Sequence, residues 1–289
     1  MADAPKTVAE ILVAATNYLA GKGRDDAKMA AELLLSRLLN CKRLELHLKS
    51  GQLLSDIQIQ AMRRGVKRVA GGEPVQYVLG EWDFMGHTFK VDRRALIPRP
   101  ETEMLVETVL KCGPLWSRHK PVIMEIGTGT GCIVISLALA RPAGLYLALD
   151  VSDEALELAR YNASNLGLGE NIAFTNGEMC DLVEPASLDT IVANLPYIPT
   201  AEYEKLPTHI RNYEPRIALD GGPTGLAVIE LVVQDSAIAL KPGGFLFMEI
   251  GSDQSAATTA LLNQAGFDAI ETVKDLAGKD RVVRGTLME

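Results

Sequence analysis

Apolar residues recur at three- and four-residue spacing over the first quarter of the chain, from Val8 to about Ala70. This spacing gathers apolar side chains on one face of a helix, so it predicts amphipathic helices. The repeating positions are Ile11, Leu12 and Ala15, then Ala30, Leu33, Leu34, Leu38 and Leu39, and finally Ile57, Ile59, Met62 and Val66. Glycines punctuate the pattern. We expect three or four helices packed as a small bundle over residues 1–72, with Ser55 as the N-cap of the last helix.

The helical pattern stops at the Gly-Gly-Glu-Pro sequence of residues 71–74, and polar and apolar residues then partly alternate as far as Val91. Alternation is typical of strands. We therefore expect a linking β-hairpin over residues 73–92, in which Trp82, Phe84 and Phe89 pack across the strands.

Short apolar runs alternate with helical patterns through the remaining residues, 93–289. Buried strands are expected at 122–126, 145–149, 172–175, 188–193 and 245–250, with two further candidates at 269–273 and 281–285. Helices are expected at 104–110, 133–140 and 153–163, the first of them capped by Thr102. Such alternation predicts an α/β fold of the Rossmann-like kind, with a mostly parallel sheet and helices on both faces.

Composition fits an ordinary globular protein of two domains, since 289 residues with 47% hydrophobic content can bury a substantial core. The net charge of -8 argues against a general nucleic-acid binder, which needs an excess of Lys and Arg to neutralise phosphates. The charge is uneven, because residues 1–72 hold twelve Lys and Arg against seven Asp and Glu, a net +5, which leaves -13 for the remainder. This basic segment is either a solvated face or a patch that docks an acidic partner or ribosomal RNA.

The sequence contains no pattern typical of a metal site or of a membrane-spanning segment. The four cysteines and four histidines are scattered without ligand spacing, so no metal site is expected. The first ten residues carry charges of both signs, and no apolar run approaches the ~18 residues that span a bilayer. We expect a cytoplasmic, monomeric protein with no membrane partner.

A glycine-rich loop follows the expected strand at 122–126. It consists of Gly127, Thr128, Gly129, Thr130 and Gly131. Glycines at a strand-to-helix junction let the backbone turn tightly and approach a ligand closely. Asp150 ends the next strand about twenty residues on, where a carboxylate binds the ribose hydroxyls of an adenosine cofactor. A simple tight turn is the alternative.

The register of these glycines distinguishes between cofactors. Nicotinamide binders typically space them as G-x-G-x-x-G, and Cys132 stands where that register requires its third glycine. The tighter G-x-G-x-G, with Glu125 two residues before it, resembles enzymes that use S-adenosylmethionine and release S-adenosylhomocysteine. After the third strand, Met179 is expected beside the adenine ring, although a surface loop at Glu178 and Met179 is an equal alternative.

The tetrapeptide Asn194, Leu195, Pro196 and Tyr197 closes the apolar run of residues 188–193. An amide or aryl amine is a poor nucleophile because its lone pair is delocalised, and acceptors on both of its N–H groups shift electron density back to nitrogen. Asn194 Oδ1 and the Leu195 carbonyl can be those acceptors. Pro196 stiffens the loop, and the Tyr197 ring can lie against a planar target. Positioning then supplies most of the rate without a strong base. We predict a nitrogen-directed methyltransferase in which these four residues are catalytic and bind substrate, with Asn194 also beside the cofactor.

With these motifs, the chain resembles the HemK/PrmC family of peptide-chain release factor glutamine methyltransferases over nearly its whole length. The supporting segments are residues 72–80, 96–103, 125–131, 194–197, 214–222 and 280–283. The resemblance implies a helical N-terminal domain that contacts the release factor, a hairpin linker and a seven-stranded S-adenosylmethionine-dependent methyltransferase domain over 93–289. It also implies that Gly127 to Gly131 and Asp150 bind the cofactor, Met179 lies by its adenine, and residues 194–197 hold the glutamine of the Gly-Gly-Gln loop of class 1 release factors.

One position departs from the family pattern. The family usually has Asn-Pro-Pro-Tyr, and Leu195 replaces the first proline. A leucine keeps the main-chain carbonyl and loses only some rigidity. Asn-Leu-Pro-Tyr also resembles the tetrapeptide of ribosomal RNA adenine dimethyltransferases.

Three alternatives follow from these patterns. Adenine offers a similar planar NH2 group, but a nucleic-acid methyltransferase needs a basic cleft, and the chain beyond residue 72 is acidic. A cofactor-binding scaffold without activity is the second alternative, and a glutamine of a ribosomal protein as substrate is the third. Residues 198–224, with Tyr203, Tyr213, Glu214 and Arg216, form a candidate lid, in which Glu214 and Arg216 could simply pair with each other.

Overall fold

The computed structural model describes residues 6–178 and 182–288. The chain divides into two compact units, Met1–Glu81 with Thr208–Tyr213, and Trp82–Pro207 with Glu214–Glu289. Each unit has a hydrophobic core of its own.

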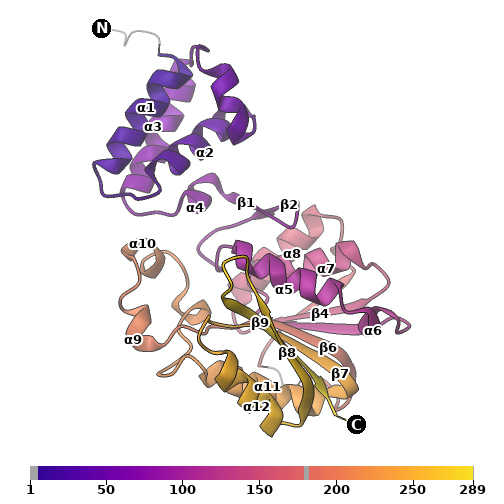
Figure 1. The fold of residues 1–289 in the computed structure, drawn as a ribbon. Coiled ribbons are helices and arrows are strands. Elements are labelled where there is room, and N and C mark those ends of the chain that lie inside the picture. Colours follow the sequence, from indigo (N-terminus) through magenta and orange to yellow (C-terminus); the bar gives the residue numbers. More distant parts are fainter. Residues whose placement is uncertain (1–5, 179–181, 289) are drawn as a thin grey trace. The chain divides into compact units, whose positions relative to one another are not determined.

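The first unit is helical (Figure 1). Its elements are α1 (Val8–Ala20), α2 (Ala27–Leu39), the 3-10 helix η1 (Arg43–Lys49), α3 (Asp56–Ala70), α4 (Val75–Leu79) and α10 (Thr208–Arg211). Two capping boxes fix helix starts, one from Thr7 with Glu10 and one from Ser55 with Gln58, so the predicted Ser55 cap is confirmed. The apolar periodicity read from the sequence becomes one core among α1, α2 and α3.

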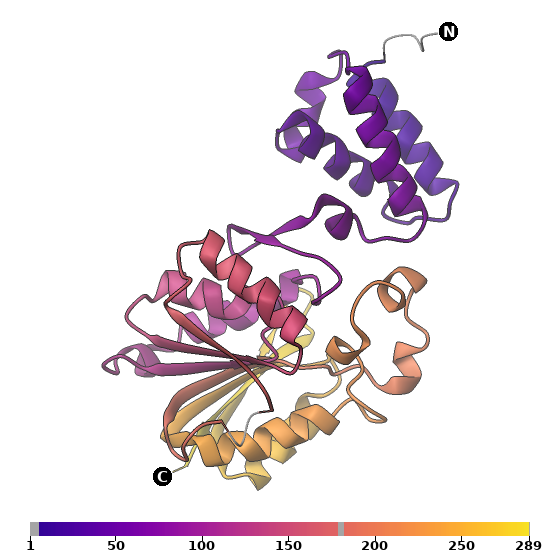
Figure 2. The ribbon, with the colours of Figure 1, turned by 180° about the vertical axis from the view of Figure 1, so that it is seen from behind.

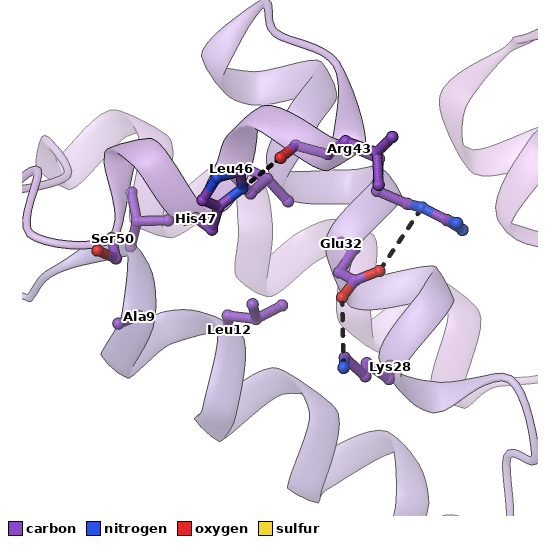
Figure 3. Close-up of a pocket in the computed structure, with 10 residues that line it drawn as sticks. Ala9, Leu12, Lys28, Glu32, Arg43, Leu46, His47 and Ser50 are labelled. Atoms are coloured by element: carbon purple, nitrogen blue, oxygen red, sulfur yellow. Dashed lines mark hydrogen bonds and ion pairs between the residues drawn. The ribbon is translucent and has the colours of Figure 1, made fainter.

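A groove of about 330 Å³ lies in this unit among α1, α2 and η1 (Figure 3). Val8, Leu12 and Leu46 line its apolar part. The basic residues Lys28 and Arg43 also line the groove, and both approach Glu32, at 3.9 and 3.6 Å. Two basic residues of the N-terminal segment are therefore paired with an acidic side chain at this groove.

The hairpin pairs β1 (Glu81–Phe84) with β2 (His87–Lys90). Met85 and Gly86 both have positive φ, which two-residue hairpin turns require. The rings of Phe84 and Phe89 meet edge to face, 6.2 Å apart between centroids, as expected from the sequence. The hairpin is shorter than predicted, because residues 75–79 form α4, whose Val75 joins the helical core.

The second unit is built on a seven-stranded sheet in the order β5-β4-β3-β6-β7-β9-β8. The strands are β3 (Val122–Ile126), β4 (Leu145–Asp150), β5 (Ile172–Asn176), β6 (Leu188–Asn194), β7 (Leu240–Glu249), β8 (Phe267–Lys274) and β9 (Asp280–Leu287). The pairs from β5 to β7 are parallel, and β9 runs antiparallel to both of its neighbours. This is the mostly parallel sheet that the sequence predicts.

Helices cover both faces of the sheet (Figures 1 and 2). The helices of this unit are α5 (Pro100–Leu110), α6 (Gly113–Trp116), α7 (Cys132–Ala140), α8 (Asp153–Asn165), α9 (Thr200–Tyr203), the 3-10 helix η3 (Arg216–Ala218), α11 (Ala227–Ala239) and α12 (Ser255–Gln264). Residues of α5 and α7 form one apolar cluster with the strands, and those of α11 and α12 form a second. The predicted α/β class is confirmed.

Thr102 does not cap α5 as predicted. The helix already begins at Pro100, with Arg99 at the N-cap position and no side-chain cap. Proline suits the first helical position because its missing N–H would have no intrahelical partner there. Thr102 consequently lies within the first turn, only 2% exposed.

Candidate active site

The glycine loop and the tetrapeptide lie at the carboxyl edge of the sheet, where the strand order reverses between β3 and β6. Such a switch point is where open α/β sheets bind ligands. Ile126 is in register with Ala193, so the residues that follow, Gly127 and Asn194, lie side by side. A Cβ placed on Gly127 would be 3.9 Å from the Asn194 carbonyl oxygen. The structure thus brings together two motifs more than sixty residues apart in the sequence.

The glycine loop has a backbone that only glycine adopts readily. Gly127, Gly129 and Gly131 have φ of 71°, 54° and 79°, in the left-handed region. The Gly129 N–H donates to Asp150 Oδ2 at 2.8 Å, and the Ser152 N–H donates to Asp150 Oδ1 at 3.0 Å. The carboxylate predicted to bind ribose is therefore held against the loop.

Hydrogen bonds to neighbouring elements also hold the two threonines of the glycine loop. The Thr128 N–H donates to the Leu149 carbonyl at 2.9 Å, and the Thr130 carbonyl accepts from Asn162 Nδ2 at 2.9 Å. Leu149 belongs to β4, which ends at Asp150, and Asn162 belongs to α8, the next helix. The loop is therefore fixed to the same strand end that carries the carboxylate.

Glu125 lies beneath this loop and is 1% exposed. Its Oε2 accepts from Thr128 Oγ1 at 2.6 Å and from the Val134 N–H at 3.1 Å. Its other oxygen, Oε1, is buried without a partner among the described residues. Burial raises the pKa of Glu125 to about 8. The Asp150 carboxylate and the unpartnered Glu125 Oε1, beside a loop open to close approach, fit a ligand rich in hydrogen-bonding groups, such as the ribose and the amino-acid part of S-adenosylmethionine.

The raised pKa of Glu125 predicts a pH-dependent stability. Between about pH 4.5 and 8 the folded chain binds more protons at this carboxyl than the unfolded chain, so the free energy of unfolding falls as pH rises. The slope from one such group is at most about 1.4 kcal/mol per pH unit. We expect Glu125→Gln to flatten the slope that urea unfolding measures between pH 5 and 8, in the absence of cofactor.

The exposed Glu170 supplies the control, and Glu170→Gln should keep the wild-type slope. Burial also raises the pKa of Glu249, to about 7, so part of the slope persists in Glu125→Gln. Identical slopes for the wild type and Glu125→Gln would show that the Glu125 carboxyl does not titrate in this way.

Asn194 ends β6 in register with Glu249 of β7. Its Nδ2 donates to Thr102 Oγ1 at 3.0 Å. Leu195, the residue that replaces the family's proline, is buried in the cluster formed with α11 and α12. Its side chain therefore contributes packing at a position where a proline would contribute stiffness.

Tyr197 is held by hydrogen bonds at its main-chain carbonyl and at its side-chain hydroxyl. Its main-chain carbonyl accepts from Gln254 Nε2 at 2.9 Å, and its hydroxyl donates to Glu249 Oε1 at 3.3 Å. Burial raises the pKa of Tyr197, so the phenol stays protonated and remains a donor. Glu249 is itself 1% exposed. The tetrapeptide of residues 194–197, called the clamp below, thus rests on side chains from α5, β7 and the start of α12.

The local sequence pattern does not reveal Thr102 as a partner of Asn194, nor the contacts of Glu249 and Gln254 with Tyr197. Glu249 did leave a signal, because it ends the apolar run of 245–248 on a strand expected to be buried, where a carboxylate is out of place. Met179, predicted beside the adenine, lies outside the described residues.

The candidate lid is held by an ion pair that the sequence analysis did not anticipate. Glu214 accepts from Arg99 at 2.5 Å and from the Ile97 N–H at 3.2 Å. Arg216 pairs instead with Asp220 at 2.8 Å. The alternative that Glu214 and Arg216 pair with each other is therefore wrong, because a buried carboxylate takes the partners that also satisfy its second oxygen.

Gly221 packs against the tetrapeptide backbone. A Cβ there would lie 2.5 Å from the Pro196 carbonyl oxygen and 2.9 Å from Tyr197 Cα. We expect Gly221→Ala to displace the clamp and lower turnover at least tenfold, while cofactor affinity stays within about threefold because the glycine loop is untouched. Turnover and cofactor titration measure the two effects.

Gly113→Ala is the matched control, since a Cβ at Gly113 meets nothing within 4 Å. It should leave both quantities unchanged. Wild-type turnover in Gly221→Ala would mean that the backbone absorbs the methyl group without moving the clamp.

Comparisons with known proteins identify the family. The PrmC N-terminal domain family matches residues 10–80, and a methyltransferase domain family matches residues 118–255. The release factor glutamine methyltransferase of Caulobacter vibrioides is 39% identical over 280 residues, which cover 96% of each chain. That of Rhodopirellula baltica is 35% identical over 285 residues, 97% of this chain and 96% of the relative.

The chain belongs to the release factor glutamine methyltransferase family. The resemblance read from the sequence is confirmed, and the chain is an S-adenosylmethionine-dependent methyltransferase. A solved methyltransferase from Pyrococcus furiosus shares the fold, with a TM-score of 0.52 and 19% identity over 70% of this chain and 89% of that one. Among residues 6–178 and 182–288, no helix has the length and apolarity to cross a membrane.

Proposed function

We propose that this methyltransferase modifies the side-chain amide nitrogen of the glutamine in the Gly-Gly-Gln loop of class 1 peptide-chain release factors. The observation that carries the proposal is the Asn194 carboxamide. Its Nδ2 end is occupied by Thr102, which leaves Oδ1 to accept from an incoming NH2 group next to the glycine loop. The relatives that match over almost the whole chain are named for glutamine methylation of release factors.

The proposal assigns a role to each part of the site. The glycine loop of residues 127–131, with Asp150 and Met179, holds the cofactor, and the bound cofactor supplies an electrophilic methyl group on a sulfonium. Asn194 Oδ1 and the Leu195 carbonyl accept the two N–H groups of the glutamine amide, which raises electron density on its nitrogen. Pro196 keeps the loop stiff, and the Tyr197 ring lies along the planar amide.

The proposal also covers the chain's organisation. Residues 1–72 dock the release factor, residues 73–92 link the two parts, and residues 93–289 carry out the methyl transfer. The division into compact units between Glu81 and Trp82 supports a helical part separable from the methyltransferase part. Release factors act at the ribosome, so we propose a cytoplasmic enzyme, and a monomer, which sedimentation of the purified chain tests.

A labelled-methyl assay tests the substrate. Purified chain and labelled S-adenosylmethionine are incubated separately with a release factor, total ribosomal proteins, bare RNA and bare DNA. We expect label only in the release factor, and mass spectrometry should place an increment of about 14 daltons, one CH2, on the Gly-Gly-Gln peptide.

A release factor with Gly-Gly-Asn in place of Gly-Gly-Gln is the matched control, because its amide is one methylene shorter and does not reach the clamp. Label in a ribosomal protein alone, or in nucleic acid alone, would replace the proposed substrate with one of those alternatives.

A further inference from the structure

Thr102 is buried in the first turn of α5, and its hydroxyl accepts the Nδ2–H of Asn194 at 3.0 Å. The two residues are 92 positions apart in the sequence. A hydroxyl on the residue that precedes a helix often caps it, but Thr102 lies inside α5, which receives no side-chain cap. The Thr102 side chain is therefore directed at the tetrapeptide instead of at its own helix.

The orientation of an asparagine amide is set by its hydrogen bonds. The oxygen and nitrogen ends are nearly equal in size, so packing alone does not distinguish the two orientations related by a half-turn. In one orientation Asn194 presents Oδ1 to the substrate, which accepts an N–H. In the other it presents Nδ2, whose hydrogens oppose the hydrogens of a glutamine amide. A neighbouring group that accepts a hydrogen bond from Nδ2 therefore selects the orientation in which Oδ1 faces the substrate.

Thr102 Oγ1 is the acceptor in this pair, because Asn194 Nδ2 offers hydrogens and no lone pair. Burial raises the pKa of the neighbouring Glu249 carboxyl to about 7, and a hydrogen bond from the Thr102 hydroxyl partly offsets that rise. The remaining lone pairs of Oγ1 then face Asn194 Nδ2. Tyr197 donates to Oε1 of the Glu249 carboxyl group at 3.3 Å.

We propose that Thr102 is a positioning residue that holds the Asn194 carboxamide in the orientation presenting Oδ1 to the substrate amide. The inference rests on the proposed function of the Asn194 clamp. It gives Thr102 a role in turnover without contact to the substrate.

The experiment compares Thr102→Val, which keeps the shape and removes the hydroxyl, with Thr102→Ser, which keeps the hydroxyl and removes a methyl group. Release factor methylation is measured under single-turnover conditions, with cofactor affinity measured alongside. We expect Thr102→Val to lower the methylation rate about tenfold, the value of one hydrogen bond, while Thr102→Ser stays within about twofold of wild type. Cofactor affinity should stay within about twofold in both variants.

A double-mutant cycle separates positioning from a general structural effect. If Thr102 acts through Asn194, adding Thr102→Val to Asn194→Ala should change the residual rate by less than about twofold. A tenfold loss that persists in the Asn194→Ala background overturns the proposal, and so does a Thr102→Val variant with the wild-type rate. Equal losses in the Val and Ser variants also overturn it, because shape and not the hydroxyl would then matter.

The wild-type chain in the same assay tests the proposed function separately. Methylation by wild type with no effect at Thr102 refutes only the positioning role, whereas no methylation by wild type refutes the proposed substrate. Should Thr102→Val lose cofactor binding and so prove misfolded, Thr102→Ala takes its place with the same expected tenfold loss.

Discussion

Asn194→Ala should lower turnover by about 10²- to 10³-fold and leave the affinity for S-adenosylmethionine within about threefold of wild type. Losing one preorganised hydrogen-bonding group that acts on the reacting centre costs this much in other enzymes. The alanine removes the acceptor for the glutamine N–H, while the glycine loop keeps its anchors at Leu149 and Asp150. Release factor methylation gives the turnover, and calorimetry gives the cofactor affinity.

Asn263→Ala is the control for this prediction. Asn263 is an exposed asparagine in α12 whose Nδ2 donates to the Thr259 carbonyl of its own helix. This substitution should change neither quantity. Equal losses of turnover and cofactor affinity in Asn194→Ala would contradict the assignment of Asn194 to the substrate amide.

The second large effect is expected at Asp150. Asp150→Ala should weaken S-adenosylmethionine binding by about ten- to a hundredfold, because hydrogen bonds to a charged acceptor are worth about 1.5–3 kcal/mol. It also releases the Gly129 N–H that the carboxylate now holds at 2.8 Å. Turnover at saturating cofactor should stay within about threefold, since the tetrapeptide is unchanged. Calorimetry and turnover at high cofactor concentration measure the two effects.

Asp268→Ala provides the comparison, because Asp268 is an exposed carboxylate on the edge strand β8. It should bind cofactor as wild type does. The expected pattern is the reverse of that for Asn194→Ala, so the two variants together test the division of labour between the loop and the clamp. Unchanged cofactor affinity in Asp150→Ala would remove this carboxylate from the cofactor site.

The sequence by itself determined the framework of the site. The apolar runs at 122–126 and 188–193 place Gly127 and Asn194 directly after strands, and carboxyl ends of parallel strands share one edge of a sheet. The local rule that serine caps a helix likewise placed Ser55 correctly. These inferences succeed because each depends on a few consecutive residues and on a periodicity that the backbone itself imposes.

Only the tertiary structure decided which side chains support the clamp. Thr102 is 92 residues from Asn194, and Arg99 is 115 residues from Glu214. Local pattern suggested a cap for Thr102 and a neighbouring arginine for Glu214, and both suggestions were wrong. The partner of a buried polar group is whatever donor or acceptor the packing brings within about 3 Å. The packing of α5 against β7 and β9 sets the distance between Thr102 and Asn194, and no periodicity in the sequence encodes it.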